Sequence, residues 1–298
     1  MKLPRSLGIG LLVTLALVGA SCGSKKKAVA TSVVAPAGAA APLPSVGPSE
    51  SAPTDSAATA PVRVKTKQSG QLAVCSDIPY APFEYFENGS DGPVVGIDAD
   101  IVKAAAATLG LKAEFRTTAF KRIFIALANG DCDVIASSVT ITDVRKQLMD
   151  FTDAYFTVHQ SILVRSADAA LNDLSAFENK IVGVPAGATF AKAEAEADAY
   201  TIKEFSGSDK LVAALTTKQV DGAVQDFPAN AYAATKSGGA LVISKVFENA
   251  GESYGLVVAK GNPDLTKALN GALAKMKADG RFKAILTKYL GSASDAGG

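Results

Sequence analysis

Residues with the chemistry to bind a small anion gather between positions 131 and 156. This stretch begins with an apolar run of the kind that forms a strand buried on both faces. Small hydroxyl side chains follow where such a strand would end, and they belong to Ser137, Ser138 and Thr140. These hydroxyls are therefore expected to line the exit of a buried strand.

Arg145 follows the hydroxyls closely and completes an anion-binding pattern. Thr142 and Asp143 are good N-cap residues before a short amphipathic turn, so Arg145 is expected beside free backbone N–H groups. A guanidinium, hydroxyls and amides at one point suit a planar carboxylate better than a phosphate, which usually requires a glycine-rich loop. The alternative is a surface arginine that pairs with Asp143 or Asp150.

An internal match suggests a position of opposite charge. Residues 125–138 can be aligned with residues 213–226 so that Ser138 corresponds to Asp226. Open parallel sheets bind ligands beyond the C-terminal ends of their strands. Two such sheets facing each other would place Arg145 on one wall and Asp226 on the other. An α-amino acid, with a carboxylate and an ammonium on one carbon, would satisfy both groups.

The elements that must position these groups alternate along the chain between strand and helix. The patterns predict strands at residues 71–76, 113–117, 133–137, 181–184, 202–205, 221–225 and 255–260. They predict helices at residues 98–109, 120–128, 189–199, 208–217, 227–236, 263–278 and 281–290. Such alternation predicts an α/β fold with mainly parallel sheets flanked by helices.

The order of these elements predicts two lobes. The first lobe is expected to combine residues 70–156 with residues 255–298, and the second to span residues 157–254. The chain would then cross between the lobes twice, near residues 154–159 and near residues 250–254. Two crossings of this kind form a hinge.

Composition narrows the classes of function. The chain has 298 residues, of which 48% are hydrophobic, and a formal net charge of +1. That length is enough for two lobes, and the near-neutral charge gives no reason to expect a nucleic-acid partner.

The N-terminus has the features of an exported, lipid-anchored chain. Lys2 and Arg5 precede the apolar run 7–18, which is too short to span a bilayer and is typical of a signal-peptide core. Residues 1–21 are thus a predicted signal peptide. The small residues before Cys22 resemble a bacterial lipoprotein processing box, with ordinary secretory cleavage as the alternative. Acyl chains such as palmitate on Cys22 would anchor the chain at the extracytoplasmic face of the cell membrane.

Residues 22–69 are predicted to form a disordered tether. This tract is rich in alanine, proline and serine and holds six of the thirteen prolines, so it can build neither a core nor a regular helix.

Catalytic, metal and cofactor chemistry are weakly supported by the sequence. His159 is the only histidine, no GxSxG motif is present, and the three cysteines have no metal-ligand spacing, so no catalytic residue, metal or cofactor is expected. Cys75 and Cys132 lie on strands expected to be neighbours. A disulfide between them requires Cα atoms within about 7 Å, and the sequence leaves this question open.

Several segments of the chain resemble those of a known family. Residues 70–290 resemble the polar amino-acid-binding proteins of bacterial ABC importers (solute-binding protein family 3), whose fold is that of the type II periplasmic binding proteins. The matching segments are SDIPYAPFEY (76–85), VGIDADI (95–101), SSVTITDVR (137–145), MDFTDAYF (149–156), DGAVQD (221–226) and SYGLVVAKGNPDL (253–265).

This resemblance implies roles for the polar residues. Arg145 resembles the family's carboxylate clamp, assisted by Thr140 and Ser138, and Thr189 matches a position that also contacts the carboxylate. Asp226 resembles the carboxylate that receives the ligand's α-ammonium.

The resemblance also implies where the ligand side chain lies. Tyr80 and Phe120 match two aromatic residues that sandwich it, and Asp77 matches the group at its far end. Together with Ser137 and Ser138, these residues resemble the pocket of lysine/arginine/ornithine-binding members. A cationic ligand would also give a buried Asp77 a partner.

Glutamine is the alternative ligand, since an amide can donate a hydrogen bond to a carboxylate. Two positions depart from glutamine-binding members, because Pro185 stands where some have Lys and Gln225 where some have His.

The expected function is therefore capture of a polar, cationic L-amino acid by a monomeric binding protein that delivers it to the membrane permease of an ABC importer. The alternative from another class is a periplasmic cyclohexadienyl or arogenate dehydratase on the same fold. Such an enzyme would need a general acid, for which Asp77, Glu84 or Asp226 would be candidates, and a group for a second carboxylate.

Overall fold

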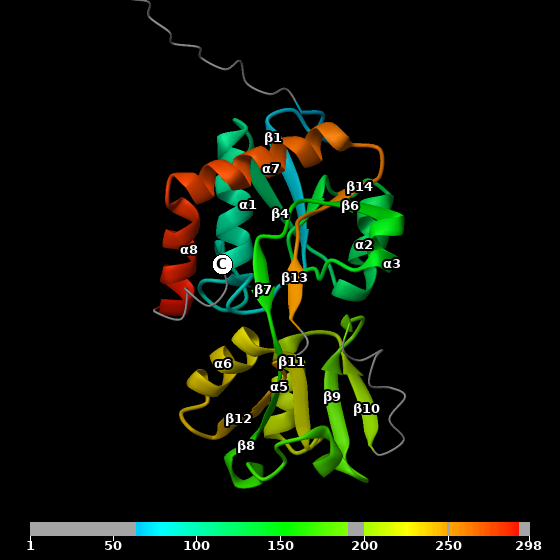
Figure 1. Ribbon diagram of the computed structural model, residues 1–298, viewed down its shortest axis with the longest axis vertical. Coiled ribbons are helices and arrows are strands. Elements are labelled where there is room, and N and C mark those ends of the chain that lie inside the picture. The colour runs from blue at the N-terminus through cyan, green and yellow to red at the C-terminus, as the bar shows by residue number, and fades with distance from the viewer. Residues whose placement is uncertain (1–63, 190–199, 249–250, 292–298) are drawn as a thin grey trace, which may run out of the picture. The chain divides into compact units, whose positions relative to one another are not determined.

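The computed structural model describes residues 64–189, 200–248 and 251–291, which form two five-stranded sheets (Figure 1). The expected signal peptide, Cys22 and the tether up to residue 63 lie outside the described residues, as does most of the helix expected at 189–199. Among the helices that the structure describes, none is long and apolar enough to cross a bilayer.

The first sheet is mixed but largely of one direction. Its strands are, in spatial order, β4 (Lys112–Thr117), β1 (Gln71–Ser76), β5 (Val134–Ile135), β14 (Val257–Ala259) and β6 (Met149–Phe151). β1 pairs in parallel with β4 and β5, whereas β14 runs antiparallel to both of its neighbours. Only β14 of this described sheet therefore opposes the others. The helices associated with the sheet are α1 (Ile97–Thr108), α2 (Phe120–Ala128), α3 (Asp143–Leu148), α7 (Pro263–Ala278) and α8 (Arg281–Leu290).

Both faces of this sheet are buried, because successive strand residues point to opposite sides. Leu72 and Val74 of β1 pack into a core shared with α1, α7 and α8. Ala73 and Cys75 pack on the other face against α2. Figure 1 accordingly shows α1 and α8 on the side of the sheet opposite α2.

The second sheet repeats this arrangement. Its strands are, in spatial order, β10 (Thr201–Phe205), β9 (Ile181–Pro185), β11 (Gly222–Asp226), β8 (Gln160–Arg165) and β12 (Leu241–Val246). β9 pairs in parallel with β10 and β11, and β8 runs antiparallel to β11 and β12. The strand that runs against the others, here β8, is again the fourth in the spatial order.

The two faces of the second sheet are covered differently. Leu163 and Ala223 pack with α5 (Ser208–Thr216) and α6 (Phe227–Lys236) on one face. Ile162 and Val224 on the other face pack against Phe177 of the short 3-10 helix η2 (Leu174–Phe177).

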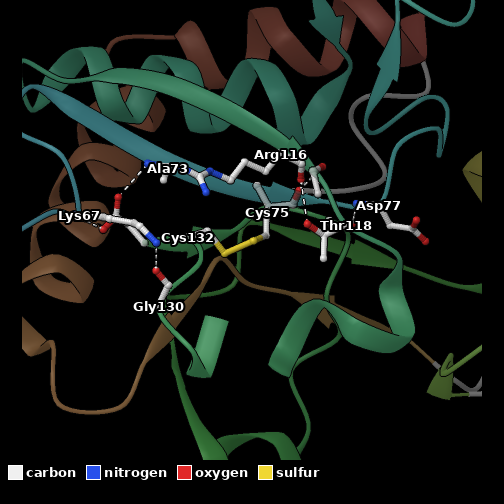
Figure 2. The surroundings of a disulfide bond; sticks show 12 residues. Lys67, Ala73, Cys75, Asp77, Arg116, Thr118, Gly130 and Cys132 are labelled. Carbon is white, nitrogen blue, oxygen red and sulfur yellow. Dashed lines mark hydrogen bonds between the residues drawn. A yellow bond between two sulfur atoms is a disulfide. The ribbon is translucent and has the colours of Figure 1, made fainter. Parts of the chain in front are cut away.

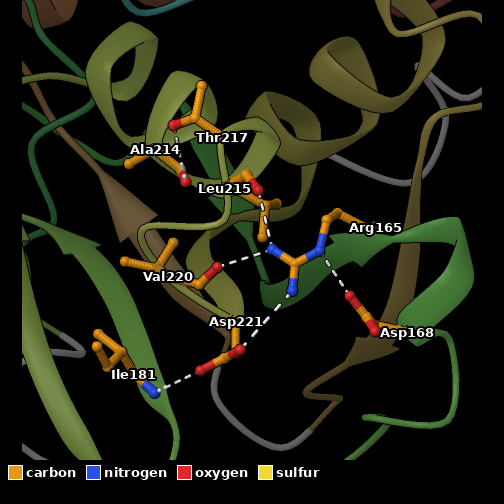
Figure 3. A network of polar contacts seen from close by, with 8 residues as sticks. All are labelled: Arg165, Asp168, Ile181, Ala214, Leu215, Thr217, Val220 and Asp221. Carbon is orange, nitrogen blue, oxygen red and sulfur yellow. Dashed lines mark hydrogen bonds and ion pairs between the residues drawn. The ribbon is translucent and has the colours of Figure 1, made fainter.

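Arg165, at the end of β8, ties several elements of the second sheet together (Figure 3). Its guanidinium donates to Asp168 Oδ2 at 2.6 Å and to the carbonyl oxygens of Leu215 at 2.9 Å and Val220 at 2.8 Å. Asp221 lies 3.7 Å from the same group and accepts a hydrogen bond from the first N–H of β9. Arg165 thus fixes where β11 starts.

The chain passes between the sheets at two paired strands. β7 (Phe156–Val158) lies between β6 and β8 in the chain, and β13 (Glu252–Tyr254) lies between β12 and β14. The two strands pair in antiparallel register, with Ser253 opposite Thr157. The two expected crossings are confirmed, and so is the α/β fold with two lobes.

The disulfide question is answered in favour of the bond. Cys75 and Cys132 are joined with a Cα separation of 5.7 Å (Figure 2). Cys75 belongs to β1, and Cys132 precedes Asp133, whose carboxylate accepts the N–H groups of Ala73 and Lys67. The loop before β5 is therefore attached to β1 by a covalent bond and by hydrogen bonds.

Most expected elements agree with the structure to within two residues, but β6, β8 and β12 were not predicted, and the two crossings were not predicted to be the paired strands β7 and β13. β8 begins with the polar pair Gln160 and Ser161, which obscures its apolar run. β12 is only partly buried along most of its length, so its pattern is not that of a core strand. A short hairpin, β2 (Tyr85–Phe86) with β3 (Val94–Val95), was also not foreseen.

Candidate functional site

A cleft of about 550 Å³, counted with its opening to solvent, lies at the ends of β1, β5, β9 and β11. These are C-terminal ends of parallel strands, where open α/β sheets bind ligands. The lining includes every residue that the sequence placed in the site, namely Asp77, Tyr80, Phe120, Ser137, Ser138, Thr140, Arg145, Thr189 and Asp226. The other residues of the lining are Glu84, Gln160, Pro185, Ala188, Gly207, Ser208 and Gln225.

Arg145 is positioned by the first turn of α3. The hydroxyl of Thr142 caps this helix by accepting the N–H of Arg145 at 3.2 Å. The guanidinium donates through Nη1 to the carbonyl oxygen of Thr140 at 2.8 Å and through Nη2 to that of Gly187 at 3.3 Å. Thr140 follows β5 and Gly187 follows β9, so the guanidinium reaches backbone on both sides of the cleft.

Two aromatic rings also contact the guanidinium of Arg145. Its central carbon lies 5.1 Å from the ring centre of Phe124 and 5.6 Å from that of Phe120, distances typical of cation–π contacts. Asp143 pairs instead with a lysine at 3.8 Å, and Asp150 with another at 2.7 Å. The interpretation of Arg145 as a surface arginine paired with either carboxylate is therefore wrong.

Asp226 lies on the opposite wall, at the end of β11. One of its oxygens accepts the hydroxyl of Tyr80 at 2.5 Å, and the other accepts the side-chain amide of Gln160. Burial raises the pKa of the Asp226 carboxyl to about 6. A ligand ammonium placed there would restore the charged form.

Asp77 follows β1 directly and is held through its backbone. Its N–H donates to the hydroxyl of Ser137 at 2.9 Å, and that hydroxyl donates in turn to Glu84 at 2.8 Å. Asp77 takes no part in this chain of bonds with its carboxyl, and it lines the cleft. Burial raises the pKa of Asp77 to about 6.

Glu84 is fully buried and carries an unused acceptor. Its Oε2 has no hydrogen-bond partner among the described residues, although the side chain lines the cleft. Burial raises its pKa well above the usual range, and the charge of Asp98 adds to the shift. From the sequence alone, Glu84 is a candidate only for the general acid of the enzyme alternative.

Ser138 has a backbone conformation that serine seldom adopts. Its φ is +50°, in the left-handed region, and its N–H donates at 2.7 Å to Oδ2 of the buried Asp98. Tyr155 donates to the same oxygen at 2.6 Å. The hydroxyl of Ser138 is buried with no protein partner in the described part of the chain, so it is available to a ligand.

Thr140 and Thr189 both donate their hydroxyl protons to Glu252. Thr140 donates to Oε2, and Thr189 donates to both oxygens, at 2.7 and 2.9 Å. A hydroxyl has one proton, so neither can donate to a ligand carboxylate in this arrangement. Glu252 itself is not in the cleft lining.

The residues that sequence reasoning missed reach the site through tertiary contacts. Gln160 belongs to the unpredicted strand β8, and Glu252 belongs to the crossing strand β13. Nothing in the spacing of either residue points to the cleft. In the described part of the chain, no cluster of three or more His, Cys, Asp or Glu side chains could hold a metal ion.

Chemically, the arrangement suits a ligand with one anionic end and more than one cationic group. The charged side chains of the cleft lining are Arg145, Asp77, Glu84 and Asp226. Arg145 is thus the only cation among the described lining residues. The carboxyls with raised pKa would be neutralised either by protons or by cationic groups of a ligand.

Comparisons with known proteins find related chains and structures. The chain is 33% identical over 221 residues to a probable histidine-binding protein of Neisseria gonorrhoeae, and the match covers 73% of this chain and 82% of that protein. The structure matches that of an ancestral arginine-binding protein bound to glutamine with a TM-score of 0.71 and 33% identity, covering 76% of this chain and all of that one.

A second solved structure is an ancestral amino acid-binding protein, a precursor of cyclohexadienyl dehydratase, with a TM-score of 0.68 and 31% identity over 74% of this chain and 95% of that one. The model of one family matches residues 72–292, which is well over half of the sequence. The chain therefore belongs to the bacterial extracellular solute-binding proteins, family 3.

Proposed function

We propose that this protein is the extracytoplasmic binding component of an ABC importer and that it captures a polar, cationic L-amino acid. The charge of the cleft carries the proposal. Three carboxyls and one guanidinium line it, so an amino acid bound by Arg145 and Asp226 still leaves Asp77 and Glu84 to face a side chain. A cationic side chain offsets that negative charge, and an acidic one would meet like charge.

The bound amino acid would be oriented by groups on both walls. Its carboxylate faces Arg145, with Ser138 near it, and its α-ammonium faces Asp226. Its side chain runs between the rings of Tyr80 and Phe120 toward Asp77. Glutamine is the second choice, because its amide can donate one hydrogen bond to Asp77 but brings no charge.

Capture would proceed by closure of the two lobes about β7 and β13. Charged groups on opposite walls reach one ligand together only in the closed state, and this difference gives the ligand its preference for closure. The protein would act as a monomer, held at the membrane by lipid on Cys22, and would pass the amino acid to a permease. Small-angle scattering would then give a smaller radius of gyration with ligand than without.

A dehydratase is the second candidate, favoured by buried carboxyls of raised pKa that could supply a general acid. One structural neighbour is a precursor of such an enzyme. Prephenate carries two carboxylates, however, and Arg145 is the only cation among the described lining residues. Incubation with prephenate, followed by absorbance, tests this candidate, and turnover would support it over binding alone.

The experiment that tests the proposal is a thermal-shift screen against the common amino acids. A ligand at one hundred times its Kd stabilises the folded protein by about 2.7 kcal/mol, which gives a clear shift. Arginine and lysine should raise the unfolding temperature most, glutamine less, and glutamate least. A screen in which no amino acid has an effect would contradict the proposal.

A further inference from the structure

Glu252 joins the two walls of the cleft. It lies on β13, one of the two crossing strands, and accepts hydrogen bonds from Thr140 and Thr189. Thr140 follows β5 of the first sheet, and Thr189 follows β9 of the second. A single carboxylate on the hinge is therefore bonded to one hydroxyl from each lobe.

The position of Glu252 decides whether it competes with the ligand's carboxylate or acts through the two threonines. A carboxylate inside the cleft would occupy the place of the ligand's own carboxylate and compete with it. Thr140 and Thr189 line both the cleft and a second hollow, whereas Glu252 lines only the second hollow, together with Lys146. Glu252 thus lies behind the two threonines and leaves the ligand's place open.

The number of hydroxyl protons determines which hydrogen bonds the two threonines can form with a ligand. Each hydroxyl has one proton and two lone pairs, and both protons are directed at Glu252. The lone pairs remain, so toward the cleft these hydroxyls can only accept. An acceptor suits the N–H groups of an ammonium, whereas the carboxylate is left to Arg145 and to backbone donors.

We propose that Glu252 is a positioning residue that links the lobes in the closed state and orients the hydroxyls of Thr140 and Thr189 as acceptors for the ligand's ammonium. This inference rests on the proposed function, which it deepens by assigning a residue outside the cleft to ligand retention. Bonds to an ionised carboxylate are about twice as strong as neutral ones, so the link favours closure.

The test is Glu252→Gln, which keeps the shape of the side chain. Its amide can still accept from one hydroxyl but must donate to the other, and the charge is lost. The Kd for arginine should rise at least about tenfold, through faster dissociation, while the association rate changes by less than about twofold. Glu248→Gln, on an exposed residue nearby in the chain, is the matched control and should leave both rates unchanged.

A second variant separates positioning from a general loss of structure. Thr189→Val removes one of the bonded hydroxyls, so adding it to Glu252→Gln should weaken binding by much less than the product of the two single effects. Fully multiplicative effects in the double variant would overturn the proposal. So would unchanged or tighter binding by Glu252→Gln.

Hydrogen exchange of the ligand-free protein reports the bond between Thr140 and Glu252, two residues that the bridge between Thr140 and Tyr254 keeps adjacent without any amino acid. The N–H of Ile141, next to Thr140, donates to the carbonyl oxygen of Ser253, next to Glu252, at 2.8 Å. Its exchange should accelerate in Glu252→Gln and not in the control. Acceleration in a protein that binds no amino acid would refute the proposed function and keep the link. Acceleration without any change in arginine dissociation would overturn the positioning role.

Discussion

Arg145 is held by groups that each favour a guanidinium over an ammonium. The two carbonyl oxygens that it contacts lie on opposite sides of the cleft, and the rings of Phe120 and Phe124 lie within cation–π distance of its central carbon. A planar fork can meet all of these while still presenting N–H groups to a carboxylate. Burial lowers the pKa of Arg145, and the charge of Glu252 opposes that shift.

Arg145→Lys should therefore weaken the binding of every amino-acid ligand. Lysine keeps the charge but loses the planar fork that can bind a carboxylate through two N–H groups, at a cost of about 2 kcal/mol or more. Calorimetry measures the change directly. Arg122→Lys, on an exposed arginine of α2, is the control and should bind as the wild type does. Equal affinity in Arg145→Lys and wild type would remove Arg145 from the site.

Asp77→Asn should change which ligand is preferred. Arginine and lysine lose a counter-charge and should weaken by about 2 kcal/mol, whereas glutamine keeps a hydrogen-bond partner and should change less. Competition binding with arginine and glutamine reports the ratio. The matched control is Asp209→Asn, an exposed carboxylate close enough to Asp77 to influence its pKa. An unchanged ratio in Asp77→Asn would contradict its assigned place at the side-chain end.

Among single residues, the sequence predicts the side chains that directly follow strands but not those that affect the site through another residue. All nine predicted side chains line the cleft. Glu252 escaped prediction because its partners, Thr140 and Thr189, are far away in the chain. Glu84 is a candidate from the sequence only as a general acid, because its partner Ser137 is also far away in the chain. Even Ser137, predicted as a lining residue, uses its hydroxyl on Asp77 and Glu84 rather than leaving it free.

The ends of four strands position the residues of the site. β1 and β5 carry Asp77 and the serines, while β9 and β11 lead to Thr189 and Asp226. These strands were predictable because each is a compact apolar run followed by polar residues. β8 and β12 were not, since the polar start of β8 obscures its apolar run and the partial burial of β12 leaves no distinct periodicity. β8 takes the fourth place in the sheet order by pairing with β11, and β12 pairs with β8 at the edge.

The disulfide attaches the loop before β5 to β1. It closes a loop with a sequence separation of 57 residues, and a loop of that size is expected to contribute about 2–4 kcal/mol to the free energy of unfolding. Replacing both Cys75 and Cys132 with serine should reduce stability by that amount in denaturant unfolding. Arginine affinity should change little, since neither cysteine lines the cleft. A loss of affinity without a loss of stability would contradict this separation of roles.

Across the whole molecule, carboxyls that resist ionisation lie in the cleft and, with Asp98, behind Ser138. Burial raises the pKa of Asp77, Asp98 and Asp226 to about 6, and it raises the pKa of Glu84 well above its usual value. Each of these groups ionises near pH 4 in the unfolded chain. Between about pH 4 and pH 6 the folded, ligand-free protein therefore holds more protons than the unfolded one, and its stability falls as pH rises through that range.

A cationic ligand should reverse this trend, because it favours the ionised carboxyls. For one carboxyl with a pKa of about 6, arginine affinity should fall roughly tenfold between pH 7 and pH 5. Ligand-free thermal unfolding over the same range should show higher stability at pH 5 than at pH 7 from these groups. Asp77→Asn should flatten part of the dependence of arginine binding on pH. Affinity that rises toward pH 5 would contradict the assignment of these carboxyls to a cation.

Calorimetric titration of the full chain at pH 7 shows whether the cleft binds a cationic amino acid through groups on opposite walls. Arginine, glutamine and glutamate differ chiefly in the charge of the side chain, so their order of affinity reports the charge of the pocket. We predict that arginine binds most tightly, glutamine more weakly and glutamate weakest of the three. Glutamate binding more tightly than arginine would contradict the account.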